Sequence, residues 1–203
     1  PRSSWANFEL AAPLARVSAA TSPVSGPVAT TLSVDVECVT NRRDKRGAPL
    51  FPSAENPDDR IVCIGMVLTV GGRSAARVAL TLCQTAPDPA QSYSTLWFRT
   101  EADLLRAYFV LVSMTSPDIL VTFNGLSFDN AYIDARAVFC GVQEREHMLC
   151  RMFERCKVVT DELSSNAMGD NANDRPTGFG LCSLDVHQWF RMNYKETTYS
   201  LGA

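Results

Sequence analysis

Apolar and polar residues alternate most regularly over residues 31–40, which read Thr-Leu-Ser-Val-Asp-Val-Glu-Cys-Val-Thr. Because a strand turns alternate side chains to opposite faces, this pattern predicts a β-strand. One face carries Val34, Val36 and Cys38, and the other carries Asp35 and Glu37. The two acids therefore point into one volume beside the predicted sheet.

Two further β-type runs follow, at residues 61–70 and 77–83. Gly71-Gly72 closes the first of them, and this dipeptide favours a tight turn between antiparallel strands. We expect the two runs to form a hairpin that pairs with the acidic strand. The result is a set of three antiparallel strands.

The next segment predicts a helix followed by a buried strand. Thr100 precedes two acidic residues in a capping pattern, and apolar residues recur at helical spacing until Pro117. Residues 119–123 are short and almost wholly apolar, as expected of a strand that is buried on both faces.

A turn and a second helix come after this buried strand. Asn124-Gly125 breaks the strand, Ser127 is a candidate N-cap, and residues 128–140 resume helical spacing. This order puts Asn124 and Asp129 near the carboxyl end of the strand, where α/β proteins tend to hold ligands.

The remaining segments are less regular. Residues 1–30 form a lead-in rich in Ala, Ser and Pro, and residues 41–60 form a charged loop that contains several prolines. Residues 144–157 are charged and predicted to be helical, while residues 160–180 are predicted to be loops or a hairpin outside the core. A last helix is expected to begin near Asp185, its N-cap.

Length and composition fit one domain with a substantial core, because the chain has 203 residues and 46% of them are hydrophobic. No apolar run approaches the ~18 residues of a membrane span, and the start lacks the pattern of a signal peptide. We therefore expect a soluble intracellular protein with no membrane partner. The seven cysteines contain no Cys-x-x-Cys pair, which favours reduced core thiols.

Charge gives no global sign of nucleic-acid binding, because 19 basic residues stand against 22 acidic ones and the net charge is −3. A local exception follows the acidic strand, namely the basic run Arg42, Arg43, Lys45 and Arg46. Such a run is usually a solvated loop, but beside a metal site it can also meet phosphates. Both interpretations stay open.

The two acids of the first strand are the strongest chemical signal in the chain. Asp35 and Glu37 lie about 7 Å apart on one face, and partial burial would force a proton onto one of them unless a cation neutralised the pair. Mg²⁺ and Mn²⁺ are the ions that such oxygen ligands select. The alternative is an edge strand with two solvated acids, and an isolated Asp-x-Glu favours that alternative.

Strand-borne Asp35-x-Glu37, followed about 90 residues later by Asn124-Gly-Leu-Ser-Phe128-Asp129, resembles two motifs of a known family. They are the Exo I and Exo II motifs of the proofreading exonuclease of family B DNA polymerases. The flanks agree, since Ser33-Val-Asp-Val-Glu-Cys38 is similar to the family's Ser-Phe-Asp-Ile-Glu-Cys. Residues 162–171 also resemble a segment of the polymerases of large DNA viruses and of the eukaryotic delta type. The likeness runs in register over roughly residues 28–203.

This resemblance implies an α/β, ribonuclease H-like exonuclease fold. Its mixed sheet has three antiparallel strands plus a parallel strand and is flanked by helices, which agrees with the order of elements predicted above. The resemblance also implies 3′ to 5′ hydrolysis of mispaired primer ends by two metal ions, Mg²⁺ or Mn²⁺. Such ions activate the attacking water and stabilise the leaving 3′ oxygen.

The resemblance also assigns roles to five residues. Asp35 is expected to bridge both ions, Glu37 to bind the ion on the nucleophile side, and Asp129 to hold the other ion. Asn124 is expected to contact the terminal nucleotide. Phe128 is expected to stack between unpaired bases, a contact worth about 1 to 3 kcal/mol. A plain turn at Asn124 and a core position for Phe128 at the start of its helix are equally open alternatives.

One part of the family pattern is missing. The fourth carboxylate should lie four residues after a tyrosine or five after a histidine, and no tyrosine or histidine in the chain meets that spacing. We therefore expect residues 31–203 to be an exonuclease domain truncated before Exo III, with residues 1–30 leading in from an N-terminal domain. Such a fragment should bind Mg²⁺ weakly and be nearly inactive. Asp185 is only a minor candidate for a substitute ligand.

The resemblance further implies partners and a place of action. The expected partners are a DNA primer-template with its single-stranded 3′ end, the rest of the polymerase chain and a processivity factor. The expected site is intracellular, at the place of DNA replication, with the nucleus favoured over the cytoplasm.

Two rival functions need no catalysis. The first is a degenerate, binding-only domain that grips single strands, against which the three surviving carboxylates argue. The second is a scaffold in which the polar segment 160–180 contacts a partner or the template strand. Ordering of that segment on addition of DNA would favour the scaffold.

Overall fold

The computed structural model describes residues 13, 15, 28–84, 90, 92–142, 157–165, 169–177 and 180–194. Residues 144–156 of the predicted helix 144–157 and nearly all of the 1–30 lead-in lie outside these described residues, and residue 157 belongs to a strand rather than to a helix.

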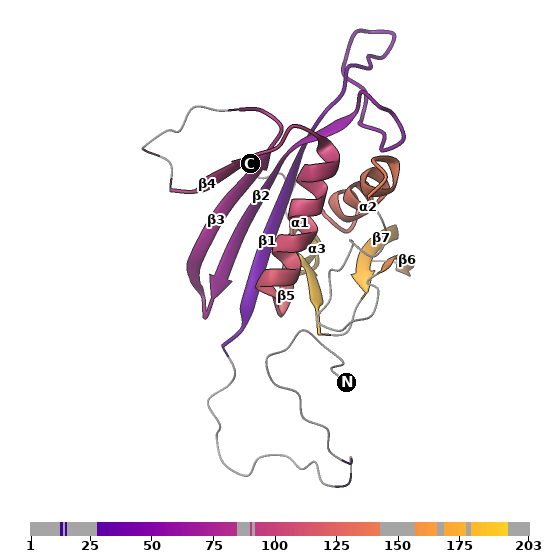
Figure 1. The fold of residues 1–203 in the computed structure, drawn as a ribbon. Coiled ribbons are helices and arrows are strands. Elements are labelled where there is room, and N and C mark those ends of the chain that lie inside the picture. The colour runs from indigo at the N-terminus through magenta and orange to yellow at the C-terminus, as the bar shows by residue number, and fades with distance from the viewer. Residues whose placement is uncertain are drawn as a thin grey trace.

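A six-stranded mixed sheet forms the framework, in the strand order β4-β3-β2-β1-β5-β8 (Figure 1). The strands are β1 Thr30–Val39, β2 Arg60–Val70, β3 Arg73–Thr81, β4 Ser94–Trp97, β5 Ile119–Thr122 and β8 Cys182–Asp185. The pairs β1–β2 and β2–β3 are antiparallel, while β5 runs parallel to β1. The predicted fold class is therefore confirmed, including the three antiparallel strands and the parallel neighbour of β1.

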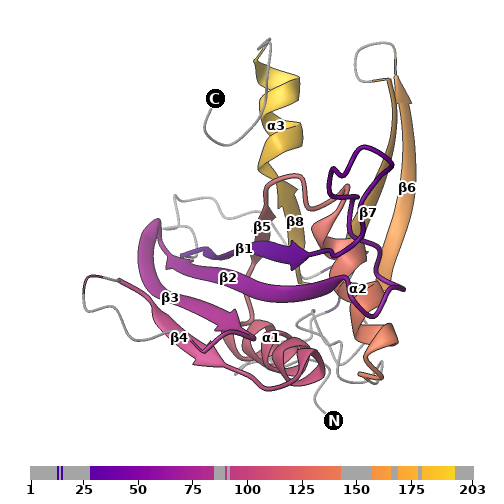
Figure 2. The ribbon, with the colours of Figure 1, turned by 90° about the horizontal axis from the view of Figure 1, so that it is seen from above.

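Helices and a second, smaller sheet complete the described part of the chain. The helices are α1 Glu101–Thr115, α2 Asp129–Phe139 and α3 Val186–Asn193, and a hairpin consists of β6 Lys157–Ser165 and β7 Gly169–Thr177. Figure 2 shows α1 along one face of the sheet and α3 extending away from the end of β8. None of the described helices has the length and hydrophobicity of a membrane span.

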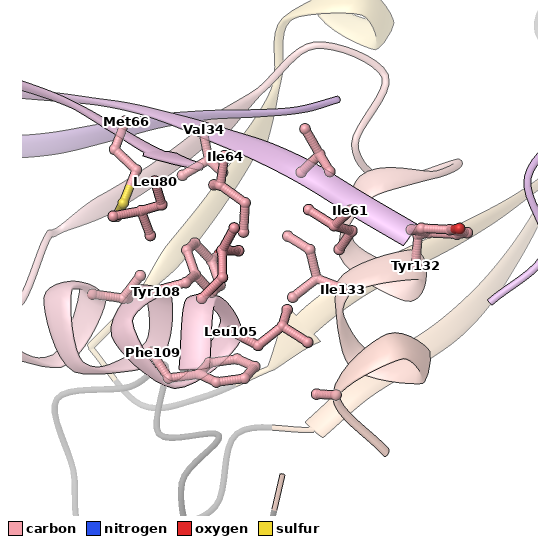
Figure 3. Packing of buried hydrophobic residues seen from close by; sticks show 14 of the residues in the cluster. Val34, Ile61, Ile64, Met66, Leu80, Leu105, Tyr108, Phe109, Tyr132 and Ile133 are labelled. Carbon is pink, nitrogen blue, oxygen red and sulfur yellow. The ribbon is translucent and has the colours of Figure 1, made fainter. Parts of the chain in front are cut away.

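The core lies between α1, α2 and the sheet face that carries Val34 and Val36 (Figure 3). Tyr108 and Phe109 of α1 are buried there, and their rings meet edge to face with centroids 5.2 Å apart. The predicted alternation along β1 is thus confirmed, because Val34 and Val36 are buried, Cys38 is half-buried, and the acidic set faces away from this core.

The turn between β2 and β3 explains why the hairpin was predictable. Gly71 and Gly72 both adopt positive φ, 58° and 77°, which is the conformation of a tight two-residue hairpin turn. Strand β3 therefore begins immediately afterwards, at Arg73, and the predicted start at residue 77 was four residues too late.

The start of α1 was also predicted correctly. The Thr100 hydroxyl accepts a hydrogen bond from the Asp103 backbone N–H at 3.1 Å. The helix ends at Ser116, which has a φ of 44° and precedes Pro117.

We expect Thr100→Ala to lower the free energy of unfolding by about 1 kcal/mol, because the first turn of α1 loses an N–H acceptor. Urea unfolding measures the change. Val110→Ala, on an exposed position of the same helix, is the matched control and should stay within about 0.5 kcal/mol of the parent chain. Equal losses in the two variants would contradict the capping role.

Several predicted details are wrong for identifiable reasons. Ser127 does not cap α2, since Phe128 occupies the N-cap position and makes no side-chain capping bond. Strand β8 precedes α3, although Asp185 caps that helix as predicted. Strand β4 was missed as well. Both missed strands have four residues, too few for a periodic signal.

The described residues of the polar segment 160–180 form the predicted antiparallel pair, β6 with β7, but they are not wholly outside the packed structure. Asn173 and Pro176 of β7 are buried, and β7 contacts α2. The five described cysteines are free, as predicted, yet Cys83 and Cys182 are exposed rather than part of the core.

Candidate active site

The acids of β1 lie on a central strand, between β2 and β5, so the edge-strand interpretation is wrong. Asp35 and Glu37 share the exposed side of the strand. Their antiparallel partners across the ladder are Gly65 and Cys63. Gly65 places no side chain beside Asp35, so the space next to that carboxylate stays open.

Parallel pairing brings three strand ends to one edge of the sheet. Strand β5 pairs in parallel with β1, and β8 pairs in parallel with β5. The residues after β5 therefore emerge beside the acids of β1, and Asp185 lies at the register position of Thr122. The carboxyl ends of parallel strands are the place where α/β sheets tend to hold ligands.

The turn after β5 carries the other predicted site residues. Asn124 adopts a φ of 63°, a left-handed conformation that asparagine tolerates better than most residues. A Cβ atom at Gly125 would lie 2.4 Å from the side chain of Thr122, so only glycine fits there. The turn leads directly into α2, whose first residue is Asp129.

Asp129 is the residue of the site whose pKa is raised. It is buried, and burial is the main cause that raises its pKa, followed by the carboxylate of Asp35. Asp185 and Glu37 add to the effect, and the pKa of Asp129 reaches about 7. The sequence predicted such an effect for Asp35 or Glu37 if they were partly buried, but both are exposed, and the raised pKa belongs to the buried Asp129 instead.

We expect this shift to make stability depend on pH in the metal-free chain. Below about pH 4 Asp129 is protonated in both the folded and the unfolded states, so folding does not have to bury a charged carboxylate. As pH rises to about 7 the unfolded chain releases the proton first, so the free energy of unfolding falls. Asp129→Asn should remove this loss and be more stable at pH 8, on the order of 2 kcal/mol.

Urea unfolding between pH 4 and pH 8 measures the effect. Asp58→Asn, a change to an exposed acid, is the matched control and should keep the pH slope of the parent chain. The same slope in Asp129→Asn and in the parent chain would contradict the assignment.

Burial also affects the thiol next to the acids. Burial, together with the nearby carboxylate of Asp129, raises the pKa of Cys38 to about 12. The thiol is therefore neutral at physiological pH and does not act as a thiolate ligand or nucleophile.

Aromatic rings form a second feature beside the acids. Phe128 is half-buried and packs against the core, and its ring centroid lies 4.9 Å from that of Tyr132. Phe51, from the loop after β1, meets Phe128 edge to face at 4.8 Å and is 71% exposed. Phe51 was not among the predicted site residues, because only the fold brings its loop beside α2.

The loop that presents Phe51 is held by one buried carboxylate. Asp59 accepts hydrogen bonds from the Arg42 guanidinium and from the Ser53 backbone, both at 2.8 Å. Burial alone would raise the pKa of Asp59, but these bonds hold it below its usual value. The residues of the basic run therefore have two different roles. Arg42 stabilises the loop through Asp59, whereas Arg43, Lys45 and Arg46 are exposed.

The carboxylate oxygens of the acids suit a hard divalent ion, but the three side chains lie too far apart to hold one together. Within the described residues, no three His, Cys, Asp or Glu side chains lie close enough together to hold a metal ion. Asp35, Glu37 and Asp129 nevertheless supply only carboxylate oxygens, which Mg²⁺ and Mn²⁺ favour. A cation would also offset the repulsion that raises the pKa of Asp129. The three residues therefore fit such an ion by chemistry.

An open cavity adjoins Asp35 on the same side of the sheet. Its volume is about 550 Å³, within the range of small-molecule sites. The lining is mostly apolar and includes Val67, Phe123 and Val186, so the cavity suits an apolar group.

Comparison with known proteins gives a consistent result. A family model described as "DNA polymerase family B, exonuclease domain" matches residues 2–203. The chain is 29% identical over 175 residues to the DNA polymerase delta catalytic subunit of Plasmodium falciparum and 30% identical over 174 residues to that of Caenorhabditis elegans. It is 26% identical over 180 residues to the DNA polymerase of Paramecium bursaria Chlorella virus NY2A.

These matches cover most of the chain but a small part of each relative. They include 84% of the chain for the Plasmodium and viral proteins and 85% for the nematode protein. The same matches span 15%, 19% and 15% of the respective relatives.

Proposed function

The chain belongs to the exonuclease domain family of family B DNA polymerases, and from this premise we propose its reaction and substrate. The proposed reaction is metal-dependent 3′ to 5′ hydrolysis, and the proposed substrate is the single-stranded 3′ end of a DNA primer. The observation that carries this proposal is the buried carboxylate of Asp129 beside the acids of β1: burial, and after it the carboxylate of Asp35, raises the pKa of Asp129. Groups with strongly perturbed pKa values gather at functional sites.

Asp35, Glu37 and Asp129 are the proposed ligands of two ions, Mg²⁺ or Mn²⁺. When bound, the ions supply charge stabilisation and an activated water for phosphodiester hydrolysis. The protein supplies the placement: β1 fixes two carboxylates on one side of the sheet, and the first turn of α2 fixes the third.

The aromatic rings are the proposed contact for bases. Phe128, whose ring contacts those of Tyr132 and Phe51, directly precedes Asp129 at the start of α2. Stacking on an aromatic ring is tolerant of base identity, which a proofreading site requires. Asn124, on the turn between the acids and these rings, is the proposed contact for the terminal nucleotide.

The proposed setting is a replicative polymerase at an intracellular site of DNA replication, with the nucleus favoured. The remainder of a polymerase chain, a primer-template and a processivity factor are the proposed partners. The exposed Arg43, Lys45 and Arg46 follow the acidic strand and are the proposed contacts for DNA phosphates.

A second candidate function is single-strand binding without catalysis. The observation in its favour is that the described acids do not converge closely enough to form a metal site. The two candidates differ in their response to metal: the exonuclease should bind a 3′ end more tightly when Mn²⁺ is present, whereas a binding-only module should not respond.

We expect Phe128→Ala to weaken binding of a single-stranded oligonucleotide in Mn²⁺ by roughly 5- to 100-fold, the effect of losing a stacked base. Fluorescence anisotropy measures the affinity. Phe139→Ala, the same substitution near the other end of α2, is the matched control and should bind as the parent chain does.

Thermal unfolding of both variants verifies that each is folded. Equal affinities for the parent chain and Phe128→Ala would remove the stacking role. Equal affinities with and without Mn²⁺, together with a loss in Phe128→Ala, would instead favour the binding-only candidate.

A further inference from the structure

Asp185 joins the turn after β5 to the start of α3. It is the last residue of β8 and is 4% exposed. Its carboxylate accepts hydrogen bonds from the backbone N–H groups of Asn124 at 2.9 Å and Leu126 at 3.0 Å. Two further N–H groups, of His187 and Gln188, donate to the same side chain at 2.9 and 3.3 Å.

The two carboxylate oxygens divide these bonds unequally. Oδ1 accepts from Asn124, His187 and Gln188, while Oδ2 accepts from Leu126. Oδ1 is therefore saturated with backbone donors, and Oδ2 is aimed at the turn.

The turn needs such an anchor because its conformation is unusual. Asn124 holds a left-handed φ of 63°, and Gly125 is packed so closely against Thr122 that a Cβ atom would clash at 2.4 Å. Conformations of this kind persist when surrounding bonds determine them. Two bonds from one buried carboxylate fix the backbone on both sides of Gly125.

We propose that Asp185 is a positioning residue that sets the conformation of the turn carrying Asn124. The expected effect of Asp185 on DNA binding rests on the function proposed above, in which Asn124 contacts the terminal nucleotide. Asp129 is held mainly by α2, whose first turn has its own bond from the Tyr132 N–H to the Phe128 carbonyl at 2.9 Å. Loss of Asp185 should therefore disturb Asn124 and Leu126 more than the proposed metal ligand.

Asp185→Asn tests this proposal in the chain as it stands. An amide can keep the Oδ1 acceptor but replaces Oδ2 with an NH₂ donor, which opposes the Leu126 N–H. The ¹H–¹⁵N spectrum should show the Leu126 amide proton moving upfield. Hydrogen exchange at Asn124 and Leu126 should rise by about tenfold or more, the scale of one bond to a charged acceptor.

Binding measurements separate positioning from ligation. In Asp185→Asn we expect the affinity for a single-stranded oligonucleotide to fall about tenfold. The affinity for Mn²⁺ alone should change by less than about threefold. Loss of a residue that merely holds a metal ligand in place typically lowers the metal affinity by about tenfold or more. A loss of Mn²⁺ affinity of about tenfold or more would make Asp185 part of the metal site and overturn the proposal.

Met192→Gly tests whether Asp185 acts only as the N-cap of α3, because this variant loosens α3 and keeps Asp185. Met192 is an exposed residue of α3, and glycine loosens the helix without touching the turn. We expect the signals of Asn124 and Leu126 to stay unchanged in this variant. Equal changes in Met192→Gly and Asp185→Asn would overturn the proposal.

The result also distinguishes this inference from the proposed function. If the parent chain binds neither Mn²⁺ nor the oligonucleotide, the proposed function fails, and the Leu126 amide alone decides whether Asp185 sets the turn. If the parent chain binds both and Asp185→Asn leaves the Leu126 amide unchanged, the inference fails by itself.

Discussion

Arg136→Met should lower the free energy of unfolding by about 3 to 5 kcal/mol, the cost of breaking a buried ion pair from one side. Arg136 is 1% exposed, and its guanidinium pairs with the buried carboxylate of Glu101. One of the two bonds, from Nε to Oε1, measures 2.9 Å. Without the guanidinium, the charge of Glu101 is left buried and without its partner.

The Glu101–Arg136 pair also makes hydrogen bonds to other parts of the backbone. Arg136 donates to the backbone carbonyls of Ala54 and Asn56 at 2.8 Å, and Glu101 accepts from the N–H of Ile61 at 2.9 Å. The pair therefore ties α1 and α2 to the loop that presents Phe51. Its loss should loosen that loop as well as the helices.

Urea unfolding measures the predicted loss. Arg106→Met is the matched control, since Arg106 pairs with Asp103 on the exposed side of α1 and its loss should cost less than about 1 kcal/mol. The double variant Arg136→Met with Glu101→Gln should recover part of the loss, because no full charge then stays buried alone. Equal costs for Arg136→Met and Arg106→Met would contradict the account.

Asp129→Asn should lower the affinity for Mn²⁺ by at least about 100-fold. Loss of an outer contact of a metal site already costs about 10- to 100-fold, and a direct ligand should cost no less. The amide keeps the size of the side chain and one oxygen, so the loss reports the missing charge. Asp35→Asn is expected to have a similar effect, because Asp35 is another of the proposed ligands.

Isothermal titration with Mn²⁺ at pH 8, where Asp129 is ionised, measures this affinity. Asp58→Asn is the matched control and should bind as the parent chain does, because Asp58 is exposed and lies outside the acidic site. Retained affinity in Asp129→Asn would mean that any bound ion is held elsewhere.

The local features of the fold were readable from sequence because their causes are local. Alternation along β1 follows from burial of one sheet face, and the Thr100 cap follows from the donors of a first helical turn. The Gly71-Gly72 turn follows from the backbone conformation that only glycine adopts easily. In each case a few adjacent residues determine the outcome.

The features that escaped prediction depend on contacts between distant residues. The bonds of Asp185 to the turn after β5 span about sixty residues, and the pair Glu101–Arg136 spans 35. Phe51 meets Phe128 only after the loop folds back on α2. The strand pattern and the order of elements pointed to the acids of the site, and the resemblance assigned their roles, whereas the groups that hold these acids in place required the structure.

Mn²⁺ is also the most direct probe of the central claim, that Asp35, Glu37 and Asp129 form one metal site. Crystals of the parent chain and of Asp35→Ala, soaked in Mn²⁺ and measured at the manganese absorption edge, locate bound ions by their anomalous signal. The account predicts a peak in contact with all three carboxylates in the parent chain and its loss in Asp35→Ala. No peak at these residues in the parent chain, or the same peak in Asp35→Ala, would contradict it.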